Sequence, residues 1–251
     1  MSPKYLTTVS IIAFGFLATV PSQSVAEEDY LWSVGLGGAV ITSPYASADD
    51  IVAPIPYFAY QGDRLALSPF GASFAFFDRP GLSFALVAAP RFQAVDRDEA
   101  PALAGMADRD PTAELGGRMD MAAWFGVLRV EALSDVLDVH GGQQVSIGYG
   151  VDISTGDLTI SPRIGAAWQS AELVDYYYGV RRNEARSNRA AYSADDAVVM
   201  SLGLDLDYAL TQRLSAVAFL AYDAFPEEIT KSPIVEDDNA AKFTLGLTYS
   251  F

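Results

Sequence analysis

The sequence contains no cysteine and a single histidine among its 251 residues. The lack of cysteine excludes disulfide frameworks, thiolate zinc sites and cysteine nucleophiles, and one histidine cannot supply a site that needs two histidine ligands. Basic residues are also scarce, since 16 Lys and Arg face 32 Asp and Glu, for a formal net charge of −16. We therefore expect no nucleic-acid partner, because phosphate binding needs clustered Lys and Arg. No motif for a metal or another cofactor is present, and none is expected.

Long apolar runs are absent except at the N-terminus. Residues 1–26 carry one basic residue, Lys4, then an apolar run from Leu6 to Val20, and end on the small residue Ala26. This order is typical of a secretory signal peptide, and the run is short for a membrane-anchoring helix. We expect residues 27–251 to form the mature domain, with a net charge of −17 because Lys4 is the only charge removed.

The remainder of the chain alternates apolar and polar residues with a period of two, which predicts β-strands with one apolar face. Similar alternation covers residues 32–40, 145–153, 198–208 and 214–222. The clearest apolar face is at the C-terminus: Ala241, Phe243, Leu245, Leu247, Tyr249 and Phe251.

Connections between these segments alternate in length. Long polar loops, among them 93–111, 170–196 and 225–240, alternate with tight turns. Long loops at one end and short turns at the other are typical of outer-membrane barrels. The sequence therefore predicts an all-β fold, a transmembrane antiparallel up-and-down barrel of about 12 strands in a bacterial outer membrane, if the chain reverses at Ser68-Pro69. If 64–77 is one strand, the alternative is about ten strands.

A soluble, secreted β-sandwich also has alternating strands, but strands of about 9–11 residues suit a tilted bilayer crossing better than the shorter strands of a sandwich. The apolar face of Leu247, Tyr249 and Phe251 resembles the C-terminal signal by which outer-membrane proteins are recognised for assembly. Lipid and lipopolysaccharide of the outer membrane are the surroundings expected for such a chain.

Charged residues on the polar faces form the group most suggestive of chemistry. The pair Asp205 and Asp207 has the spacing for acid–base work or cation binding. We expect instead that charges of mixed sign line a wet lumen and pair with one another, and that the protein is not an enzyme. The predicted lumen-facing charges are Glu114, Arg118, Asp120, Arg129, Glu131, Asp152, Arg163, Asp205, Asp207, Arg213, Asp223 and Lys242.

One long loop holds three consecutive tyrosines at 176–178 and a cluster of four arginines at 181, 182, 186 and 189. The tyrosines offer a platform for carbohydrate, but we expect them to pack the loop against the barrel rim. The arginines are expected to pair with nearby acids. His140, beside Gly141 and Gly142, is interpreted as an ordinary loop residue rather than a metal ligand.

Several segments together resemble the MipA/OmpV family of outer-membrane proteins, the MltA-interacting protein family, over the whole mature length. The matching segments are Gly35–Gly38, Pro44-Tyr45, Pro54–Tyr57, Thr112–Gly117, His140–Gly142, Tyr176–Val180 and Lys231–Val235. This chain departs from the resemblance in the very acidic stretch 96–110 and at Asp237-Asp238.

The resemblance implies a non-enzymatic barrel that acts as a scaffold, linking a lytic transglycosylase and a murein synthase in peptidoglycan maintenance. It defines no partner-binding residues in this chain. A narrow cation-preferring, porin-like channel, suggested by the acid excess, and a surface adhesin are the alternative functions.

Overall fold

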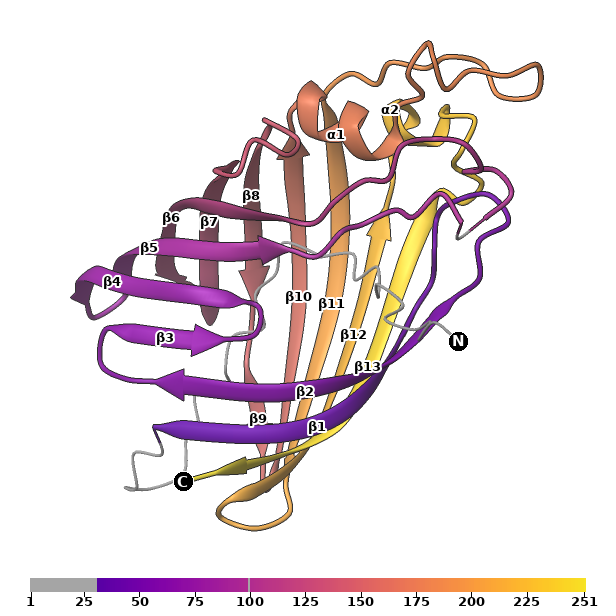
Figure 1. Ribbon diagram of the computed structural model, residues 1–251. Coiled ribbons are helices and arrows are strands. Elements are labelled where there is room, and N and C mark those ends of the chain that lie inside the picture. Colours follow the sequence, from indigo (N-terminus) through magenta and orange to yellow (C-terminus); the bar gives the residue numbers. More distant parts are fainter. Residues whose placement is uncertain (1–30, 99) are drawn as a thin grey trace.

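The computed structural model describes residues 31–98 and 100–251, and the expected signal peptide lies outside this part of the chain. The chain forms one antiparallel sheet that closes on itself, since β1 pairs with β13 and β10 pairs with β11 (Figure 1). The strands are β1 (Trp32–Ile41), β2 (Ile51–Gln61), β3 (Leu65–Ser68), β4 (Gly71–Arg79), β5 (Leu82–Arg91), β6 (Thr112–Ala123), β7 (Gly126–Asp135), β8 (Gln143–Gly150), β9 (Ile153–Thr155), β10 (Leu158–Gln169), β11 (Ala197–Ala209), β12 (Leu214–Ala224) and β13 (Asn239–Ser250). Two short helices, α1 (Ala171–Tyr178) and α2 (Glu227–Thr230), lie in loops.

Strand β9 continues β8 after a two-residue interruption at Val151 and Asp152, so the closed barrel has 12 strands. The partner strand β10 carries Pro162 at this level, and proline has no N–H to donate to a neighbouring strand. The Val151 N–H instead donates to the Pro162 carbonyl at 3.2 Å. The missing donor thus explains why the ladder breaks here.

The predicted reversal at Ser68-Pro69 is confirmed, because Ser68 pairs with Gly71 across the hairpin between β3 and β4. The all-β barrel of about 12 strands is confirmed with it, and the alternative of ten strands is wrong. Neither helix of the described chain has the length and apolar character needed to span a bilayer.

The period of two in the sequence becomes an alternation of exposure along the strands. On β13, Leu245, Leu247 and Tyr249 are each about half exposed, and the outer apolar residues of β1 and β11 behave in the same way. A water-soluble protein would bury such residues, whereas a barrel in lipid presents them to hydrocarbon. The outer face is therefore the lipid-facing surface of an outer-membrane-type barrel.

The first and last strands close the barrel through their ends. The Trp32 N–H donates to the Phe251 carbonyl at 3.2 Å, and the Phe251 N–H donates to the Trp32 carbonyl at 2.9 Å. Inside this seam the hydroxyls of Ser33 and Ser250 are 2.9 Å apart. Leu247, Tyr249 and Phe251 are exposed on the outside, and their role as an assembly signal stays a prediction.

Candidate functional site

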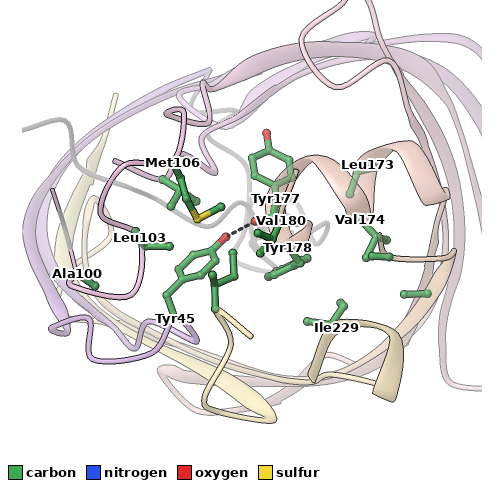
Figure 2. Close-up of a cluster of buried hydrophobic side chains, with 14 of the residues drawn as sticks. Tyr45, Ala100, Leu103, Met106, Leu173, Val174, Tyr177, Tyr178, Val180 and Ile229 are labelled. Carbon is green, nitrogen blue, oxygen red and sulfur yellow. Dashed lines mark hydrogen bonds between the residues drawn. The ribbon is translucent and has the colours of Figure 1, made fainter. Parts of the chain in front are cut away.

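Long loops at one end of the barrel fold inward and bury a hydrophobic cluster over its mouth, which we call the cap (Figure 2). The cap draws residues from the loop after each of β1, β5, β10 and β12. Its buried members are Tyr45, Val95, Ala100, Leu103, Met106, Leu173, Val174, Tyr177, Tyr178, Val180, Ala194, Ala197, Val199, Ile229 and Ile234. Loops that only flank a pore would stay solvated, so these loops form a folded layer of their own.

Helix α1 supplies the centre of the cap. Tyr177 and Tyr178 are almost fully buried, and Tyr176 packs against them. The Tyr45 hydroxyl donates to the Tyr177 carbonyl at 3.4 Å, which joins the first loop to the helix. Burial raises the pKa of Tyr178 to about 12. The expectation that these tyrosines pack the loop onto the barrel is confirmed.

A buried ion pair holds two of the cap loops together. The Arg109 guanidinium donates to both carboxylate oxygens of Glu184, at 3.0 and 3.2 Å, and the two side chains are 2% and 4% exposed. The same carboxylate accepts the N–H groups of Ala107 and Arg181 at 2.9 and 3.0 Å. Burial alone would raise the pKa of Glu184, but these hydrogen bonds outweigh it and lower the pKa to about 2.

Arg189 behaves differently from the sequence-based expectation of pairing with an acid. Its guanidinium is buried and donates to the backbone carbonyls of Ala102, Ala104 and Glu184. Carbonyls at the ends of short turns have no partner within their own loop, so a long arginine can satisfy several of them at once. Arg189 therefore ties the loop after β5 to the loop after β10.

A second polar group lies at the edge of the cap, where strands β5, β6 and β8 begin or end. The Arg91 Nε donates to Glu114 at 2.9 Å, and its Nη2 donates to Gln144 at 3.0 Å. His140 Nδ1 accepts the Gly142 N–H at 2.9 Å, which leaves Nε2 as the protonated nitrogen, 3.4 Å from the Glu114 carboxylate. His140 is thus a buried structural residue. Sequence reasoning missed Arg91, although alternation along residues 82–91 places it on the inner face.

Asp135 organises the loop that carries His140. Its carboxylate accepts N–H groups of Leu137, Val139, His140 and Gly141 at 2.6–3.0 Å. The Thr112 hydroxyl donates to it at 2.6 Å. A single carboxylate surrounded by backbone donors fixes the loop without any ligand.

Four of the predicted lumen charges form one cluster on β6 and β7. Asp120 accepts from Arg129 at 2.6 Å and lies 3.4 Å from Arg118, which is 3.8 Å from Glu131. The alternating signs neutralise one another along two neighbouring strands, as charges in a confined polar lumen must.

The remaining predicted charges are distributed more widely. Arg163 pairs with Asp205 at 2.5 Å and approaches Asp152 at 3.9 Å. Asp207 lies two residues further along β11, and Arg213 is in the turn before β12. Of the predicted pair, Asp205 is therefore the member held by an arginine.

Asp223 and Lys242 stand apart from these clusters. Asp223 is 1% exposed and lies opposite Ser201. Lys242 lies over the Phe70 ring, with its Nζ 5.5 Å from the ring centroid. Among residues 31–98 and 100–251, no group of three or more His, Asp or Glu is arranged to hold a metal ion.

Sequence comparison places the chain among outer-membrane proteins. The sequence model of the family described as MltA-interacting protein MipA matches residues 34–251. The chain is 28% identical to the putative outer membrane protein YiaT of Escherichia coli K12, over 97% of both chains. It is 29% identical to the MltA-interacting protein of the same strain, over 98% of this chain and all of the relative, and 26% identical to OmpV of Vibrio cholerae, over 97% and 96%.

Solved structures with a similar arrangement include bacterial channels. The CymD monoaromatic hydrocarbon channel aligns with a TM-score of 0.44 and 13% identity over 89% of each chain. The NanC porin aligns with a TM-score of 0.44 and 8% identity, over 87% of this chain and all of the porin.

Proposed function

Because the chain belongs to the MltA-interacting protein MipA family, we propose that this outer-membrane barrel is a non-enzymatic scaffold that links a murein hydrolase to a murein synthase during peptidoglycan maintenance. The name of the Escherichia coli relative states an interaction with MltA. In this chain the corresponding partner is a lytic transglycosylase held at the periplasmic side of the membrane.

The capped mouth is the observation that carries this proposal. A barrel that conducts solutes keeps a continuous wet path, whereas here helix α1, the buried Tyr177 and the Arg109–Glu184 pair lie across the opening. The charges of β6 and β7 pair with one another, so few of them are free to bind a passing ion. Both features favour a barrel used as a platform.

Affinity capture tests the scaffold directly. The tagged barrel, solubilised from envelopes in mild detergent, should retain a lytic transglycosylase through washing, and a second barrel from the same envelopes carrying the same tag serves as control. Recovery of this barrel without any murein enzyme under conditions that keep it folded would contradict the proposal.

Planar-bilayer recording separates the scaffold from the alternative channel. The purified barrel should give no stable conductance steps. Well-defined cation-selective steps, in a preparation free of contaminating porins, would instead support a narrow channel. The excess of acidic residues is the observation that suggests such a channel.

A further inference from the structure

The barrel wall is incomplete on one side of the β3–β4 hairpin. Strand β2 runs from Ile51 to Gln61, yet only Tyr60 and Gln61 pair with β3. Strand β5 likewise extends to Arg91, three residues beyond Ala88, its last partner on β4. Beyond the hairpin tip, β2 and β5 therefore have edges that face each other without a strand of residues 31–98 or 100–251 between them (Figure 1). We call this interruption the wall gap.

Prolines mark both edges of the wall gap. Four prolines lie in the described strands, and three of them, Pro54, Pro56 and Pro90, lie on the free stretches of β2 and β5. The Gln61 N–H donates to the Leu31 carbonyl on the β1 side, so alternate residues, including both prolines of β2, face the gap. A proline lacks the N–H that would otherwise be left unpaired there.

The position of the gap in a membrane barrel has a physical consequence. Hydrocarbon cannot satisfy a free backbone group, and open sheet edges are tolerated at membrane depth only where they line a polar or protein-filled space. The prolines remove donors, but the carbonyls of the same residues remain. The edge therefore fits a passage between membrane and lumen better than a plain lipid-facing wall.

A cation without an acid partner lies on the lumen side of the hairpin tip. Within the described chain no carboxylate is in ion-pair range of Lys242. Its ammonium lies instead over the ring of Phe70, the residue between Pro69 and Gly71 at the hairpin tip. On the same inner face of β13, the Thr244 hydroxyl is buried and has no hydrogen-bond partner among the described residues. An ammonium without an acid partner and an unsatisfied hydroxyl at adjacent inward positions of one strand suit an anionic group.

The residues directly opposite these two polar groups are apolar, and the nearest inward acid, Asp223 on β12, pairs with Ala240, one inward position away from Lys242. Lys242 shares its row with Ile41 and Ile51, and Thr244 shares its row with Ala39 and Ala53. This sector contrasts with β6 and β7, where inward positions carry mutually paired charges. A single cation with apolar residues directly opposite it, and outside ion-pair range of Asp223, is the pattern that an amphiphile with one acidic head group would match.

We propose that the wall gap is a lateral entry route by which a single-chain acidic amphiphile, of which a fatty acid is the simplest example, passes from the membrane to Lys242. The carboxylate replaces the Phe70 ring on the ammonium, accepts a hydrogen bond from Thr244, and leaves its chain against the apolar rows and the gap. The hairpin tip then moves aside as the occupant enters. This inference does not depend on the scaffold function, because it involves no murein enzyme.

Photo-cross-linking tests the route. The full barrel is reconstituted in phosphatidylethanolamine–phosphatidylglycerol vesicles that contain palmitate with a diazirine on its chain, illuminated, and mapped by mass spectrometry. Cross-links should concentrate on residues 51–59, on the hairpin tip 68–71 and on inward residues of β13. Labelling confined to outward residues, evenly around the barrel, would overturn the proposal.

A matched pair of lysine variants tests the recognition of the acid. Lys231 and Lys242 are the two lysines of the described chain, and Lys231 is exposed in a loop beside Glu227. Lys242→Gln should reduce cross-linking at inward positions about tenfold or more, since a buried charge-assisted bond is lost, and Lys231→Gln should not change it. Unchanged inward labelling in Lys242→Gln would refute the role of the cation.

The methyl ester of the same probe gives a test on the unmodified protein, which avoids the case of a variant that does not fold. The ester has the same chain but no negative charge, so it should label outward residues as before and lose the inward cross-links. Equal inward labelling by acid and ester would show that the protein does not recognise the carboxylate, and would also overturn the proposal.

Discussion

Arg109 and Glu184, 75 residues apart in the chain, form a bidentate ion pair inside the cap. One belongs to the loop after β5 and the other to the loop after β10, so the pair joins two loops that start from non-adjacent strands. Because both side chains are buried, removal of either leaves an uncompensated charge in a dry environment.

Glu184→Gln should therefore loosen the cap while the barrel stays folded. The expected cost is about 3 kcal/mol, the usual scale for breaking a buried ion pair. Limited proteolysis should cut the loop 170–196 faster, with the heat-modifiable mobility of the barrel on SDS gels retained. The control is Arg97→Gln, which removes an exposed, solvent-screened pair with Asp108 and should leave the protection of the loop unchanged. Equal protection in both variants would contradict this role of Glu184.

The cap should also lose stability in acid. The folded pKa of Glu184 is about 2, below its ordinary value of 4.5, so the stabilisation is present above about pH 4.5 and disappears as the pH falls toward 2. Hydrogen exchange in the cap loops, corrected for the intrinsic effect of pH, should rise across this window. In Glu184→Gln the rise should be much smaller, and an identical profile in both proteins would argue against this carboxylate.

Gly116 on β6 should not tolerate a side chain. A Cβ at this position would lie 1.8 Å from the Ala132 carbonyl oxygen of β7, far inside contact distance. Gly116→Ala should force the two strands apart at a cost of about 1–3 kcal/mol. Gly38→Ala, where the nearest atom within range is 3.9 Å away, is the matched control. The two variants are compared by the temperature at which the folded band is lost on SDS gels.

Deletion of Phe251 should impair assembly while leaving export intact. The residue contributes both hydrogen bonds to Trp32 at the closing seam, and it ends the exposed apolar row of Leu247 and Tyr249. Phe251→Leu retains the backbone bonds and an apolar side chain, so it separates closure from aromatic recognition. Envelope fractionation with heat-modifiability reports the outcome, and normal insertion of the truncated chain would exclude an essential role.

The barrel was predictable because its information is local. Alternation along residues 198–208 or 241–251 shows which face of each strand is apolar. Loop length shows which end of each strand lies at the end of the barrel with long loops and which at the end with short turns. Even the short β3 followed from Ser68-Pro69, since proline seldom continues an interior strand. These signals need no knowledge of distant parts of the chain.

The cap was less predictable, because its contacts join residues far apart in sequence. Nothing near Glu184 identifies Arg109 as its partner, and Arg189 binds carbonyls that only folded turns bring together. Arg91 is a different case, because the alternation of its strand predicts its position on the inner face, whereas its hydrogen bond to Glu114 could not be predicted. The wall gap likewise depends on how far β3 and β4 extend relative to their neighbours.

The seam between β1 and β13 joins hydroxyls that are 217 residues apart. Closure therefore becomes available only when β13 has been made, because β1 has no earlier strand to pair with on that side. Contacts of such long range form slowly. A formal charge of −16 makes unclosed chains repel one another during that interval, which opposes their association.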